Sequence, residues 1–167
     1  MMRYLRIISI GAVAALAMLP TAALAGTYSP AGVGGAGPTT VQWKHGVPLL
    51  TCTLTATTNS DGTISSTGVP SGTKITGITL ANGLCMGVIF NGLPYDITTL
   101  NATDVVINDV RVLGASSNCR GNLRAKLVGG VLQFQHTNMI PSDPPGGTPC
   151  SLAGNVTTSP AASYTYP

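Results

Sequence analysis

The sequence lacks glutamate altogether, and only 8% of its 167 residues are charged, where an ordinary soluble domain has about a quarter. The shortage of charge argues against long exposed helices, which draw on glutamate and lysine for their solvent face. It also argues against a disordered acidic or basic tail. Threonine (22) and glycine (21) are the most frequent residues instead, and serine adds 12. This length and composition predict one domain made of strands and turns.

Residues for acid–base and nucleophilic catalysis are few. No GxSxG nucleophile elbow is present, and the nearest text, residues 114–118 (GASSN), lacks the second glycine. The two histidines, His45 and His136, are expected at the surface. Glycosidase chemistry would have to use aspartates alone, and Asp104 and Asp109 are expected on opposite faces of a strand because they are five residues apart. We therefore predict that the protein is not an enzyme.

The sequence predicts no metal, cofactor or nucleic-acid site. It contains no CxxC pair, no aspartates at the spacing of a calcium loop, and no lysine or helix start after the glycine-rich run GVGGAG. Arg120, Arg124 and Lys126 are close in sequence, but no aromatic residues are interleaved with them. We interpret these three residues as the solvated face of a strand.

The first 25 residues have the features of an export signal. Arg3 and Arg6 precede an uncharged apolar run over residues 7–19, and residues 23–25 (ALA) fit the rule for cleavage after Ala25. Thirteen helical residues rise only about 20 Å, too short for a membrane of about 30 Å, so stable membrane insertion is not expected. Without this segment, six basic residues face five aspartates, a net charge of +1. We expect a secreted bacterial protein in the extracellular space or at the cell surface.

Four cysteines follow the signal, and an even number in an exported chain predicts two disulfides. Three pairings are possible. We favour Cys52–Cys85 and Cys119–Cys150, because the two intervals are similar and each encloses one hairpin-like segment. Each bridge is expected to stabilise the fold by roughly 3–4 kcal/mol.

Beyond the signal, the chain divides into an arm and a domain. Residues 26–40 (GTYSPAGVGGAGPTT) are uncharged and rich in Gly, Pro and Thr, which predicts a flexible, unpaired arm. Residues 41–167 are expected to form a single β domain. Residues 50–57 alternate apolar and hydroxyl side chains, the turn at 59–62 (NSDG) predicts that 63–67 return as the partner strand, and Gly129-Gly130 predicts a two-residue hairpin between 123–128 and 131–135. About 7–10 short strands predict an antiparallel β-sandwich or barrel.

Aromatic residues make up 5% of the chain. Phe90, Tyr95 and Phe134 are expected in the core. Trp43, Tyr164 and Tyr166 are the candidates for self-association or ligand contact, because they lie near the ends of the domain. Several strands carry no charge that would protect an edge, so we also expect pairing with another copy by strand addition through the arm.

The chain resembles the small secreted bacterial proteins called protein activator of alkane oxidation, the PraB-like family. The resemblance rests on CTLTATTNSDGTI (52–64), NGLCMGVIFNGLPY (82–95), DVVINDVRV (104–112), Cys119 and PCSLAGNVTTSP (149–160), and it spans most of the chain after the signal. It implies a secreted, non-catalytic β protein associated with growth on hydrocarbons and with the cell surface or biofilm matrix. The loop PSDPPGGTP and the basic group at 120–126 depart from the pattern.

Two functions follow as hypotheses. The first is a non-enzymatic protein of the cell surface or extracellular matrix that self-assembles or binds matrix components. The alternative is a soluble binder of hydrophobic small molecules that solubilises alkane or promotes its uptake. The low charge and the expected arm favour the first, and the few aromatics argue against a hydrocarbon pocket.

Overall fold

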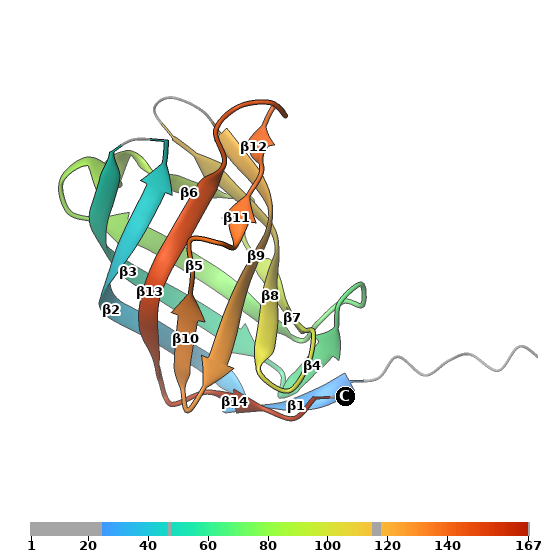
Figure 1. Ribbon diagram of the computed structural model, residues 1–167. Coiled ribbons are helices and arrows are strands. Elements are labelled where there is room, and N and C mark those ends of the chain that lie inside the picture. The colour runs from blue at the N-terminus through green and yellow to red at the C-terminus, as the bar shows by residue number, and fades with distance from the viewer. Residues whose placement is uncertain (1–24, 47, 115–117, 167) are drawn as a thin grey trace, which may run out of the picture.

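Eight antiparallel strands close into a barrel in the computed structural model, which describes residues 25–46, 48–114 and 118–166 (Figure 1). Around the barrel the strands follow the order β7-β5-β3-β2-β13-β10-β9-β8, and pairing of β8 with β7 closes it. Their bounds are β2 Gly32–His45, β3 Leu49–Ser60, β5 Thr73–Ala81, β7 Tyr95–Thr99, β8 Asp104–Leu113, β9 Asn118–Val128, β10 Val131–Phe134 and β13 Cys150–Ser159. The prediction of an all-β antiparallel sandwich or barrel is confirmed as a barrel.

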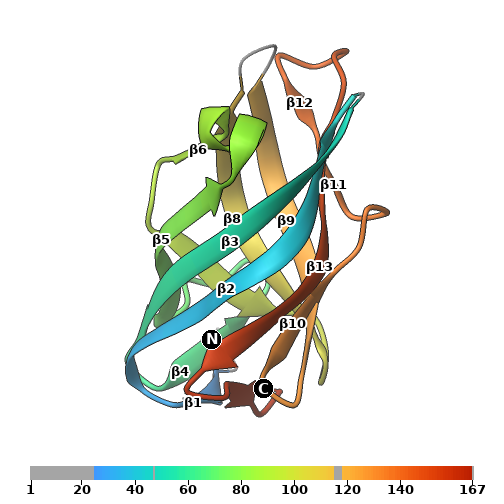
Figure 2. The same ribbon diagram turned by 90° about the vertical axis from the view of Figure 1, so that its left-hand side faces the viewer.

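Six short strands and one 3-10 turn decorate the barrel. They are β1 Ala25–Ser29, β4 Thr63–Ser66, η1 Gly83–Gly87, β6 Ile89–Asn91, β11 Met139–Ile140, β12 Ser142–Asp143 and β14 Ser163–Tyr164. β1 lies between β4 and β14, and β6 pairs with β8. Figure 2 shows η1 and β6 at one end of the barrel, and β1 and β14 at the other.

Period-two alternation places the core inside the barrel. In β9 the side chains of Leu123, Ala125 and Leu127 are buried, whereas Arg124 and Lys126 between them are exposed. The predicted hairpin after β9 is confirmed, because Gly129 and Gly130 have φ of 57° and 77° and Val128 pairs with Val131. Positive φ at both positions is the geometry of a type I′ turn, which matches the twist of the flanking strands.

Two disulfides tie the barrel together, and both predicted pairs are confirmed. Cys52–Cys85 joins barrel strand β3 to η1, and Cys119–Cys150 joins β9 to β13. The predicted core aromatics are also confirmed, since Phe90, Tyr95 and Phe134 are buried.

The prediction of a flexible arm over residues 26–40 is wrong in this fold. Most of the segment belongs to β1 and β2, and β2 pairs with β3 on one side and β13 on the other. Ala36, within the supposed arm, is buried in the core. Gly37 of this segment is needed for packing, because a Cβ there would collide with the Leu54 carbonyl, and a Cβ at Gly34 would lie 3.0 Å from the Thr58 hydroxyl, which would have to shift.

The turn at residues 59–62 bends the chain without reversing its direction, and the prediction that residues 63–67 return as the partner strand is wrong. β4 does not return along β3; it pairs antiparallel with β1 and parallel with β7. The last residue of β3, Ser60, contacts β5 instead: its hydroxyl forms a 2.7 Å hydrogen bond with the hydroxyl of Thr73. The turn sequence therefore predicted where the chain bends, but it did not predict that β4 pairs with β1 and β7.

Asp104 and Asp109 lie on the same outer face of β8, contrary to the prediction of opposite faces. A register shift between Ile107 and Val110 interrupts the pairing of β8 with β9, and Asp109 has φ of 48°. Such a bulge adds one residue and resets the alternation of side chains.

The predicted signal over residues 1–25 lies outside the described residues except for Ala25, so the cleavage after Ala25 stays a prediction. In the part of the chain that the structure describes, no helix has the length and apolar character needed to cross a membrane.

Candidate functional site

Four large apolar side chains on η1, β6 and β8 are exposed at one end of the barrel. The exposed fractions are 75% for Leu84, 72% for Met86, 56% for Ile89 and 38% for Leu113. The first three come from η1 and β6 within six residues of chain, and Leu113 lies directly opposite Ile89 across the β6–β8 pair. We call these four residues the rim patch, after its place beside η1 (Figure 2).

The disulfide explains why the rim patch faces outward. Cys85 is the middle residue of η1, and its bond to Cys52 draws that side chain into the core, where it is 1% exposed. Its neighbours Leu84 and Met86 therefore have to point away. The turn is held further by the Asn82 amide, which donates to the Thr53 hydroxyl at 2.5 Å. Grouped exposed apolar side chains on a well-anchored segment are typical of a contact surface.

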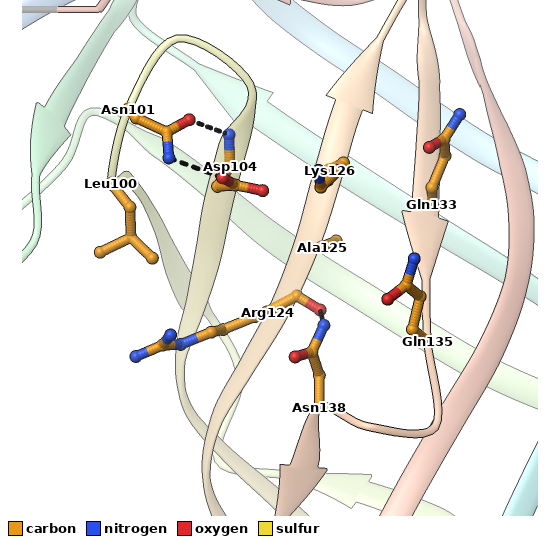
Figure 3. A pocket seen from close by; sticks show the side chains of 9 residues that line it. All are labelled: Leu100, Asn101, Asp104, Arg124, Ala125, Lys126, Gln133, Gln135 and Asn138. Atoms are coloured by element: carbon orange, nitrogen blue, oxygen red, sulfur yellow. Dashed lines mark hydrogen bonds between the residues drawn. The ribbon is translucent and has the colours of Figure 1, made fainter.

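A polar groove of about 280 Å³ crosses the outer face of β8, β9 and β10 (Figure 3). We call it the β8–β10 groove. Its polar lining consists of one carboxylate, two cations and four amides: Asp104, Arg124, Lys126, Asn101, Gln133, Gln135 and Asn138. Register puts Asp104 opposite Lys126 and Lys126 opposite Gln133, so these three side chains form a row across three strands.

The loop that begins the groove is tightly hydrogen-bonded. The Asn101 amide donates to the Asp104 carboxylate at 2.6 Å, and its carbonyl oxygen accepts from the main-chain N–H groups of Thr103 and Asp104, both at 2.9 Å. The Tyr164 hydroxyl donates to the main-chain carbonyl of Asn101 at 2.8 Å. Burial and the nearby Asp104 carboxylate raise the pKa of Tyr164 to about 12. The hydroxyl therefore stays protonated, and the loop is held, at neutral pH.

The cations of β9 have different partners. Arg120 contacts Asp109 at 2.7 Å, and Arg111 contacts the same carboxylate at 2.6 Å. Hydrogen bonds from these two guanidinium groups lower the pKa of Asp109. Within the described residues, neither Arg124 nor Lys126 has a carboxylate within 4.0 Å. Of the three cations expected on the solvated face of β9, Arg120 is thus neutralised by Asp109, and Arg124 and Lys126 have no carboxylate partner among the described residues.

The barrel interior holds an apolar cavity of about 30 Å³ near the end that carries β1 and β14. Tyr28, Ile75, Ile97 and Leu132 are among its lining residues. This volume is that of about one water molecule. This cavity therefore has no room for an alkane chain in this conformation.

Neither histidine lies in a hydrolytic triad among the described residues. The His136 Nδ1 is 2.9 Å from the Ser151 hydroxyl, but its Nε2 is buried without a partner and Ser151 is only 4% exposed. His136 is half-buried rather than at the surface. His45 lies near Cys119 and Cys150, whose sulfurs are bonded to each other and are not the thiolates that a metal requires.

The three aromatic residues predicted for self-association or ligand contact are not brought together. Trp43 is 3% exposed and packs edge-on against Phe90 at 6.1 Å, so the prediction of a surface role for it is corrected. The alternation of residues 41–44 (VQWK) in β2 turns Trp43 inward and Lys44 outward. The Tyr164 hydroxyl donates a hydrogen bond to the main-chain carbonyl of Asn101, whereas Tyr166 is 50% exposed and stays a candidate for self-association or ligand contact.

Sequence reasoning missed both the rim patch and the groove. The signal for the patch was the text GLCMG, in which apolar residues flank a cysteine inside a glycine-bounded turn too short to bury them all. The groove had no local signal, because its residues meet only through the register of three strands.

Comparison with known proteins gives one match. No curated protein matches the chain, and no solved structure matches it. The family model described as alkane oxidation protein activator PraA/PraB-like matches residues 2–166, nearly the whole chain. The resemblance inferred from the cysteines and turns is confirmed, and the chain belongs to the PraA/PraB-like family of alkane oxidation protein activators.

Proposed function

We propose that the protein promotes alkane oxidation outside the cell without catalysing it, by adsorbing to hydrocarbon through the rim patch. The observation that carries the proposal is the exposure of Leu84 and Met86 on a turn pinned by the Cys52–Cys85 disulfide. The family is named for activating alkane oxidation, and we therefore propose hydrocarbon as the apolar ligand of the patch. The two disulfides suit an oxidising compartment outside the cytoplasm.

The apolar contact belongs on the surface rather than inside the barrel. The interior cavity of about 30 Å³ accommodates no alkane, whereas the rim patch is already open to solvent. Fully burying one side chain such as leucine or methionine is worth about 1.5–3 kcal/mol. Several such side chains on one rigid end of the molecule favour adsorption to a hydrocarbon–water boundary.

Self-assembly through the rim patch is the competing hypothesis. The strand-addition route through residues 26–40 has lost its support, because β2 already has a neighbour on each side. Two copies that met through Ile89 on β6 would cover the patch and leave it unable to contact alkane. Light scattering of the purified protein distinguishes the two, since adsorption as proposed needs a monomer with an open patch.

The test is the interfacial tension of a hexadecane drop in a solution of residues 26–167. The variant Leu84→Ser/Met86→Ser is expected to need more than about tenfold higher concentration for the same fall in tension, since two side chains lose their apolar contact. The matched control is Val33→Ser/Val128→Ser, which removes two apolar side chains that are 79% and 48% exposed elsewhere. Equal losses in the two variants contradict a specific patch.

A further inference from the structure

We propose that the β8–β10 groove is a binding site for a polyuronate, that is, a polysaccharide whose sugar units carry carboxylate groups. The proposal rests on the groove alone and does not depend on hydrocarbon binding. It assigns a second ligand to a second face of the molecule.

The cations of the groove are available for carboxylates. The Arg124 and Lys126 side chains project from alternate positions of β9 into the groove, and Figure 3 shows Arg124 reaching across β8. In the described residues no carboxylate forms an ion pair with either, in contrast to Arg120, which is held by Asp109. Guanidinium and ammonium groups bind carboxylate through charge-assisted hydrogen bonds.

The remaining polar groups select hydroxyls. Asp104 lies in the same groove, and its carboxylate accepts hydrogen bonds but donates none. One of its oxygens accepts from Asn101, and Figure 3 shows the other turned toward β9. An ionised phosphate or sulfate group would offer that oxygen only further acceptors and like charge. A sugar hydroxyl offers a donor.

Amides complete the match to a sugar chain. Gln133, Gln135 and Asn138 line the groove, and each amide has two donors and one acceptor group. Vicinal hydroxyls both donate and accept, so they suit such amides. The groove has no aromatic lining, which indicates recognition of sugar edges rather than stacking on ring faces.

The groove also has length for more than one sugar unit. It spans three strands about 4.8 Å apart. It adjoins a second hollow of about 220 Å³ that shares Arg124 and Asn138 with it and continues to Asn122 and Thr137. The Asn138 side chain at the junction is held by the Arg124 carbonyl at 3.4 Å.

The groove and the rim patch are far enough apart to act independently. Asp104 begins β8 in the groove and Leu113 ends the same strand in the patch. A strand of ten residues spans roughly 30 Å. Occupation of one site therefore leaves the other open.

Isothermal titration of residues 26–167 with oligogalacturonate, at about 0.15 M salt and neutral pH, tests the proposal, because distant charges are then largely screened. Two reference polymers separate the contributions: polyacrylate has carboxylates without hydroxyls, and dextran has hydroxyls without carboxylates. Oligogalacturonate is expected to bind about tenfold or more tightly than either, because only it satisfies both the cations and Asp104. Equal binding of polyacrylate, or no binding of oligogalacturonate at millimolar concentration, overturns the proposal.

Two double variants locate the site. Arg124→Gln/Lys126→Gln is expected to weaken oligogalacturonate binding about tenfold or more. Lys44→Gln/Lys74→Gln removes the same charge from other strands and is expected to change binding less than about twofold. Equal weakening by both pairs overturns the groove assignment. Arg124, Lys126 and Lys44 are exposed, whereas Lys74 is half-buried in a 3.0 Å ion pair with Asp96. A far-UV circular dichroism spectrum like that of the wild type is therefore required of both variants before their affinities are compared.

The same variants keep the two sites distinguishable. Arg124→Gln/Lys126→Gln is expected to lower the interfacial tension of a hexadecane drop as much as the wild type does. Leu84→Ser/Met86→Ser is expected to bind oligogalacturonate with the affinity of the wild type. Loss of both activities in either variant contradicts independent sites.

Discussion

Ile89 on β6 and Leu113 on β8 lie directly opposite each other, and both side chains are exposed. Cross-strand neighbours have Cβ atoms about 5 Å apart, so the two side chains form one continuous apolar surface. Ile89 follows two residues after η1, where Leu84 and Met86 are exposed to a still greater degree. The barrel thus presents these four exposed apolar side chains at the end where the Cys52–Cys85 disulfide anchors η1.

The two disulfides are expected to have similar effects on stability and different effects on adsorption. They span 33 and 31 residues, so Cys52→Ala/Cys85→Ala and Cys119→Ala/Cys150→Ala should each lose about 3–4 kcal/mol in urea unfolding. Only the first pair frees η1, so only it should weaken the fall in hexadecane tension. Equal adsorption by both variants would argue that η1 needs no anchor to present the patch.

Deletion of residues 26–40 is expected to abolish folding rather than assembly. The deletion removes most of β1 and the first half of β2, and β2 is a barrel strand paired on both sides. Circular dichroism and resistance to protease measure the outcome. A truncated protein that stays folded and protease-resistant would contradict the strand order.

Alanine substitutions at Gly37 and Gly68 separate backbone strain from steric clash. Both glycines have positive φ, 84° and 89°, which costs any other residue about 1–2 kcal/mol. A Cβ at Gly37 would collide with the Leu54 carbonyl, whereas one at Gly68 meets nothing within 4 Å. Urea unfolding should show a loss of roughly 2–5 kcal/mol for Gly37→Ala and about 1–2 kcal/mol for Gly68→Ala. Equal losses of stability in the two variants would contradict the close approach of Gly37 in β2 to Leu54 in β3.

Asp109 should contribute to the loss of folding free energy that the protein shows as the pH is lowered. Arg120 and Arg111 lower the pKa of this carboxyl in the folded state below the unfolded value of about 3.9. Its stabilising effect is therefore complete above about pH 5 and is lost as the pH falls through the folded-state pKa.

Asp109→Asn tests this contribution, because asparagine tolerates the positive φ at this position. The variant should be less stable than the wild type at pH 7, by at most about 1 kcal/mol for so exposed a group. The difference should shrink on acidification toward pH 2. A difference that is constant with pH would assign the effect to the bulge geometry instead.

Much of the barrel was predictable because alternation and cysteine spacing are local signals. β9 and its Gly129-Gly130 turn followed from period-two alternation and a two-residue loop, and the disulfides from two similar intervals. Trp43 was also within reach, since alternation over residues 41–44 turns it inward. Its neighbours Lys44 and His45 gave the misleading impression of an exposed entry segment.

The arm and the edges expected for β10 and β13 were misread for one physical reason. Glycine-rich, uncharged strands indicate flexibility or exposed edges when each strand is considered alone. In a closed barrel each barrel strand has two neighbours, which removes the edges of β10 and β13, whereas β6 outside the barrel pairs with β8 on one side. Glycines also let tightly coiled strands approach each other. Closure is a property of the whole sheet, so residues 32–38 carried no local sign of it.

The candidate sites depended on tertiary structure to different degrees. The β8–β10 groove needs the register that sets Asp104, Lys126 and Gln133 in one row, and the bulge near Asp109 shows how easily one residue changes that register. The rim patch had a partial signal in the apolar residues around Cys85.

Oxidative labelling of methionine in the presence of hexadecane droplets tests whether the protein adsorbs to hydrocarbon through the rim patch. Met86 in the rim patch is 72% exposed, and Met139, on another face of the barrel, is 56% exposed and serves as the internal control. Peptide mass spectrometry gives the rate at which peroxide forms the sulfoxide at each residue. Adsorption through the rim patch predicts that droplets slow oxidation of Met86 severalfold and leave Met139 unchanged. Equal protection of both residues, or oxidation of Met86 at its rate in free solution, would contradict it.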